Sequence, residues 1–131
     1  MGNLDLLPCL SPDNFEKMFG VDERNGQDYA ADMAVRQFLH QNQKEATTYF
    51  TCLWDKQNYY SANLALCRAN IDNDITHGTN ICTAYSNYLR CSGNVYTRCG
   101  IDAKLFACRI EETIIEAFVG NYCYNKLFCY Q

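Results

Sequence analysis

The stretch that decides the fold is residues 79–124, TNICTAYSNYLRCSGNVYTRCGIDAKLFACRIEETIIEAFVGNYCY. It carries five of the nine cysteines of the chain within sequence that has helical periodicity. The first four are spaced nine, eight and nine residues apart, and no two form a Cys-x-x-Cys pair. This spacing is typical of cross-linked helices, and it specifies no reaction.

The spacing of Cys82 and Cys91 predicts that they bond to different partners. Both lie on a helix expected over residues 79–92, with Thr79 as its N-cap. Nine residues along a helix separate them by about 13 Å and place them on opposite sides. A disulfide requires Cα atoms within about 7 Å, so this helix should be held from two sides. The alternative is a pair of buried free thiols.

Composition bounds the class of protein. The 131 residues suffice for one domain over 1–131, and 48% hydrophobic against 20% charged residues indicates a globular chain. Two prolines and seven glycines favour helices. We therefore predict an all-α fold, a small disulfide-stabilised bundle of about four to five helices. Nine cysteines indicate an oxidising compartment, so we expect a secreted, extracellular protein.

The periodicity of apolar residues places the remaining elements. Residues 1–10 should form an extended N-terminal arm, and they lack the features of a signal peptide, so we expect a mature form. Residues 71–78 should be a solvated loop, and a turn is expected near 54–58. Helices are expected over residues 12–19 with Ser11 as N-cap, about 26–54, 56–70, 79–92, and 102–119 with Asp102 as N-cap. The second of these has a weak point at 41–43.

Catalytic and metal-binding motifs are not recognisable. His40 is expected to be a partly buried helix residue and His77 a surface residue. The acidic residues Glu111, Glu112 and Glu116 are expected to form a solvated helix face. Matched cysteine and histidine pairs with zinc spacing are absent from the sequence, so we predict no metal, no cofactor and no enzymatic activity.

Aromatic residues are the other notable feature, with ten tyrosines and seven phenylalanines. Tyrosines usually pack at the rim of a core with the hydroxyl in water, but they are also enriched at protein interfaces. Candidate members of a recognition surface are Tyr59, Tyr60, Tyr96, Tyr122, Tyr124 and Tyr130.

The sequence favours a secreted binding protein, a toxin-, hormone- or effector-like ligand of a protein receptor. Two alternatives stay open: a carrier of an apolar small molecule in a cavity between helices, and a small secreted hydrolase. A carrier predicts a closed apolar pocket, whereas a receptor ligand predicts packed helices and exposed aromatic residues. The net charge of −4 argues against nucleic acid, and no apolar run is long enough for a membrane span.

An odd number of cysteines cannot all pair within one chain. Cys9 lies 43 residues before the next cysteine, on the expected arm, so we predict that it joins two chains in a homodimer. The other eight should form four internal disulfides whose pairing the sequence leaves open: Cys52, Cys67, Cys82, Cys91, Cys99, Cys108, Cys123 and Cys129.

Overall fold

A computed structural model describes residues 18–19, 26–123, 126–127 and 129. Within them the chain forms five α-helices and no strand, so the predicted all-α bundle is confirmed. The elements in order are α2 (Gly26–Gln41), α3 (Gln43–Tyr59), α4 (Ser61–Thr76), α5 (Ile81–Tyr96), η3 (Thr97–Cys99), α6 (Ile101–Val119) and η4 (Gly120–Cys123).

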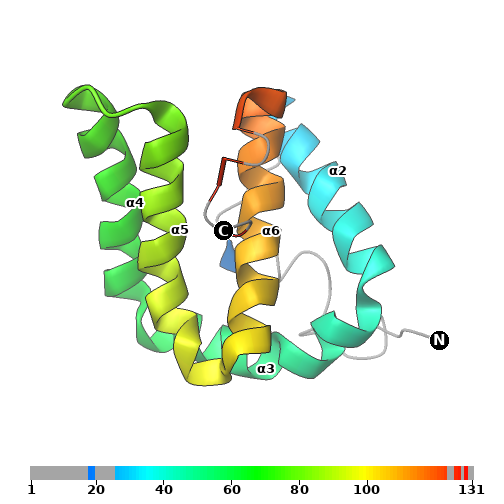
Figure 1. Cartoon of the computed structure of the whole chain (residues 1–131). Coiled ribbons are helices and arrows are strands. Elements are labelled where there is room, and N and C mark those ends of the chain that lie inside the picture. The colour runs from blue at the N-terminus through cyan, green and yellow to red at the C-terminus, as the bar shows by residue number, and fades with distance from the viewer. Residues whose placement is uncertain (1–17, 20–25, 124–125, 128, 130–131) are drawn as a thin grey trace.

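The helices α2, α4, α5 and α6 stand side by side, and α3 crosses beneath them (Figure 1). α4 and α5 form an antiparallel hairpin, and α6 packs mainly against α5 and α2. α4 and α6 therefore run in the same direction, with α5 antiparallel to both. This arrangement places the carboxyl ends of α4 and α6 at the same end of the molecule as the α4–α5 connection.

The expected helix over 26–54 is two helices, since the chain turns at Asn42. The Nδ2 of Asn42 donates to the carbonyl of Phe38 at 2.8 Å, and its φ of −129° leaves the helical region. The Asn42 side chain thus competes with backbone N–H groups for a helix carbonyl, at the weak point noted in the sequence. The expected turn at 54–58 is wrong by a few residues, because α3 continues to Tyr59 and the chain bends at Tyr60.

The expected loop over 71–78 is also wrong, because α4 extends to Thr76. Gly78, with φ of +88°, ends it: its N–H donates to the carbonyl of Ile75, and the N–H of Thr79 donates to that of Asp74. The Asp-Asn-Asp triplet that suggested a solvated turn therefore forms the last turns of a helix. The helix ends at Gly78 because glycine readily adopts the positive φ that this C-terminal turn requires.

Two N-caps also differ from expectation. Asn80, not Thr79, caps α5, and its side chain accepts a hydrogen bond from the N–H of Cys82 at 2.9 Å. α6 begins at Ile101 after Gly100, whose φ of +97° turns the chain out of η3, so Asp102 lies inside the first turn. An acidic residue there still stabilises the positive end of the helix.

Four disulfides pair the eight predicted cysteines, with Cα atoms 5.4–6.1 Å apart. As predicted, Cys82 and Cys91 bond to different partners, which fixes α5 to η4 at one end and to α4 at the other. The pairs are Cys52–Cys99, Cys67–Cys91, Cys82–Cys123 and Cys108–Cys129. Every helix from α3 to α6 is thereby cross-linked, and Cys9 lies outside the described residues.

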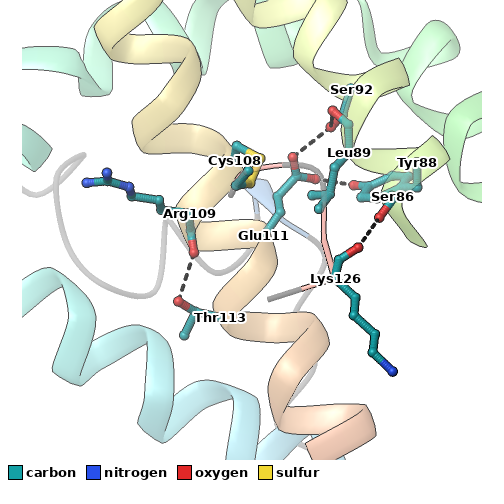
Figure 2. The surroundings of a disulfide bond; sticks show 10 residues. Ser86, Tyr88, Leu89, Ser92, Cys108, Arg109, Glu111, Thr113 and Lys126 are labelled. Atoms are coloured by element: carbon teal, nitrogen blue, oxygen red, sulfur yellow. Dashed lines mark hydrogen bonds between the residues drawn. A yellow bond between two sulfur atoms is a disulfide. The ribbon is translucent and has the colours of Figure 1, made fainter. Parts of the chain in front are cut away.

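The core consists of two clusters of buried side chains. The larger one joins α2, α3 and α6, and includes Val35, Leu53 and Ile110. The smaller one lies between α4, α5 and α6 and is built around three of the disulfides, with Leu89 and Leu127 fully enclosed. The C-terminal segment contributes to this second cluster and is tied by the Ser86 hydroxyl, which donates to the Lys126 carbonyl at 3.1 Å (Figure 2).

Candidate functional site

A pocket of about 330 Å³ opens between α4, α5 and α6. Its apolar residues come from α4, from α6 and from the segment before α2. They are Phe19, Ile71, Ile114, Ile115 and Phe118. Its polar residues come from all three helices, and they are Arg68, Tyr85, Tyr88 and Glu111. This volume lies at the lower end of the range for small-molecule sites, which are typically apolar with a few polar groups.

Glu111 is the polar centre of this pocket. It is 4% exposed, and its carboxyl points from α6 towards α5 (Figure 2). One oxygen accepts a hydrogen bond from the Tyr88 hydroxyl, and the other accepts one from the Ser92 hydroxyl at 2.8 Å. Tyr88 and Ser92 lie four residues apart on α5, so both hydroxyls face α6. The carboxyl is therefore held in one position.

Burial changes the acid–base properties of the pocket. Loss of hydration raises the pKa of Glu111 from 4.5 to about 7, although the hydrogen bonds from Tyr88 and Ser92 and the charge of Arg68 act in the opposite direction. The pKa of the Tyr88 hydroxyl is raised well above its usual value by burial and then by the Glu111 charge. At neutral pH the pocket thus contains a carboxyl that exists in both protonation states.

The acidic residues of α6 overturn a prediction. Glu111 and Glu112 are both 4% exposed and Glu116 is half-buried, so they are not a solvated face. The reason is position: Glu111 lies four residues after Ala107 and four before Ile115, within the apolar stripe of the helix. That spacing was the signal in the sequence that could have identified the site. His40 is exposed rather than partly buried, and His77 is exposed as expected.

The candidate recognition tyrosines do not form one surface. Tyr96 is 1% exposed and belongs to the core, so its assignment was wrong: its place on the inner face of α5 buries it against Phe19, 6.2 Å between ring centroids. Tyr59 is 78% exposed and packs edge-on against the half-buried Tyr60, at the junction of α3 and α4. Tyr122, also exposed, lies on η4 at the opposite end of the molecule. Tyr124 and Tyr130 lie outside the described residues.

Among the described residues, no group of three or more His, Cys, Asp or Glu side chains is arranged to hold a metal ion. In the same part of the chain, none of the helices has the length and apolar character required to cross a membrane.

A search of protein-family models found no match to this chain, and comparisons with curated proteins and with solved structures found none either.

Proposed function

We propose that this protein is a secreted carrier that binds one small apolar molecule in the pocket between α4, α5 and α6. The observation that supports this function is the combination of an apolar lining with a single buried carboxyl network at one end. Ligand sites of this kind gain affinity from apolar contact, and a few fixed polar groups orient the ligand. The four disulfides favour an extracellular location.

Binding of the uncharged fluorescent probe phenylnaphthylamine tests this function. We expect one probe per chain, with enhanced emission, and at least a tenfold loss of affinity in Ile71→Trp, since the indole would occupy the pocket from a half-buried position (~1.4 kcal/mol per tenfold). Leu66→Trp is the matched control, because Leu66 is 66% exposed on the same helix and does not line the pocket. Equal probe binding by both variants, or no binding by the wild type, would contradict the proposal.

A second candidate function, a ligand for a protein receptor, is favoured by the outer face of α4. This helix packs mainly against α5, and exposed apolar side chains follow a three-four spacing along it: Tyr59 just before its start, then Ala62, Leu66 and Ala69. Such a stripe is typical of a helix that docks on a partner. Beside it a groove of about 370 Å³ lies between α4 and α5, with Arg98 stacked over Tyr60 at 4.5 Å.

The receptor candidate is tested by saturable binding of labelled protein to cells. Leu66→Glu should abolish such binding, because it places a charge in the centre of the apolar stripe. Leu105→Glu, at a 37% exposed position on α6, should not. If the two variants behave alike, the α4 face is not the receptor-binding surface.

A further inference from the structure

The charged residues of the pocket lie towards one end, and Tyr85 is the one polar lining residue close to the α4–α5 connection. Tyr88 and Glu111 touch across α5 and α6, and Arg68 on α4 acts on both of them electrostatically. Two apolar residues lie closer to the α4–α5 connection. Ile71 is one turn beyond Arg68 on α4, and Phe118 is seven residues, or about 10 Å, beyond Glu111 on α6. The pocket therefore has a charged end and a mainly apolar end, which matches an elongated amphipathic molecule.

Arg68 supplies the positive charge of the pocket. Arg68 lines the pocket, and no hydrogen bond or ion pair joins it to another described residue. Its charge lowers the pKa of Glu111, and both residues line the same pocket. A half-buried cation beside a pocket favours an anionic partner, since a carboxylate accepts two parallel hydrogen bonds from guanidinium.

Glu111 complements this preference. Its two oxygens already accept hydrogen bonds from Tyr88 and Ser92, so its position is fixed without a ligand. In its protonated form it carries one O–H donor, and an acceptor group located between it and Arg68 would receive that hydrogen bond. An alcohol would leave Arg68 without an ionic partner, and an ammonium group would be repelled by it. A carboxylate satisfies both groups.

We propose that the pocket selects a small amphipathic carboxylic acid, with its carboxylate between Arg68 and Glu111 and its tail along Ile71, Ile114 and Phe118. This inference rests on the proposed carrier function, and it specifies the class of the ligand. No bond is made or broken, and the acid binds as its anion.

Calorimetric titration with octanoate, octanol and octylamine tests the assignment at neutral pH. We expect octanoate to bind tightest, and Arg68→Gln to reduce its affinity at least about tenfold while leaving that of octanol unchanged. Arg109→Gln is the matched control, since Arg109 is exposed on α6 and does not line the pocket. The helical circular-dichroism spectrum of each variant shows whether it is folded.

The outcomes separate the two proposals. If none of the three compounds binds and phenylnaphthylamine does not bind either, the carrier function itself fails. If octanol or octylamine binds as tightly as octanoate, or if Arg68→Gln weakens octanoate and octanol equally, the carrier function stands and the acid preference is wrong. A loss of octanoate binding in Arg109→Gln equal to that in Arg68→Gln would also overturn the assignment, because it would show a general charge effect.

Discussion

The hydroxyl of Tyr88 on α5 donates a hydrogen bond to the buried carboxyl of Glu111 on α6. These residues lie 23 positions apart in the chain, and their contact joins the two central helices beside the disulfide-rich cluster. A buried carboxyl costs free energy unless it is protonated or hydrogen-bonded. The contact thus links the protonation of one residue to the stability of the fold and to the polarity of the pocket.

Stability should fall between about pH 4.5 and pH 7. The pKa of Glu111 is raised to about 7 in the folded protein, so over this interval the unfolded chain releases a proton that the folded chain retains. The loss is fully present above pH 7 and amounts to about 3 kcal/mol. Glu111→Gln carries no charge in either state, so its stability relative to the wild type should rise by that amount across the interval.

Urea unfolding from pH 4 to pH 8, followed by the fluorescence of Trp54, measures this dependence; Trp54 is the single tryptophan of the chain. Glu45→Gln, at an exposed position on α3, should follow the wild type. If Glu111→Gln and the wild type show parallel pH profiles, the carboxyl is not titrating in this range in the folded protein.

Tyr88→Phe should raise the pKa of Glu111 further, because the hydrogen bond that it removes favours the ionised carboxyl. Above pH 7 the variant should lose about 1–3 kcal/mol of stability, since a buried carboxylate is left with one hydrogen bond fewer. The loss should be smaller at pH 5, where the carboxyl is neutral. NMR titration of the Glu111 side-chain carboxyl gives the pKa, with Tyr85→Phe on the same helix as the control. A lowered pKa in Tyr88→Phe would contradict the argument.

The four disulfides predict an intact mass about 8 Da below that of the reduced chain, two protons for each bridge. Peptide mapping without reduction should recover Cys52–Cys99, Cys67–Cys91, Cys82–Cys123 and Cys108–Cys129 as the linked pairs. A fully reduced native protein would argue against the secreted location.

Removal of single disulfides should have graded effects. The Cys52–Cys99 bridge closes a loop of 47 residues and the Cys108–Cys129 bridge one of 21, so the paired serine variants should lose about 4 and about 3 kcal/mol respectively in the chain-entropy model. Urea unfolding of the two double variants gives these values. Equal stability of either variant and the wild type would show that the corresponding bridge does not stabilise the fold.

Cys9 is expected to join two chains, and this stays a prediction because the residue lies outside the described part of the chain. With the other eight cysteines paired internally, Cys9 is the remaining thiol. The wild type should run as a dimer in non-reducing electrophoresis, and Cys9→Ser should run as a monomer. A monomeric wild type, or a dimer band that persists in Cys9→Ser, would disprove the bridge.

Local patterns predicted which segments are helical better than where the helices end. The apolar stripes of α5 and α6 depend only on spacing along one segment, so the sequence was sufficient for them. The ends of α4 and α5 were misplaced because Asp72–Asp74 and Thr79 have ordinary turn and cap propensities, whereas closure at Gly78 and capping by Asn80 depend on backbone geometry. Tyr96 was assigned to the surface because the helix was expected to end at residue 92, whereas α5 continues to Tyr96 and buries its side chain.

The sequence by itself determined the class of fold, the cross-linking of the helices and the separate partners of Cys82 and Cys91, because these follow from composition and from the fixed rise of a helix. Only the tertiary structure decided the disulfide pairing, the burial of Glu111 and its meeting with Tyr88, Ser92 and Arg68. Those residues come from three different helices. Their proximity depends on how the helices pack, and the raised pKa of the carboxyl depends on the water that this packing excludes.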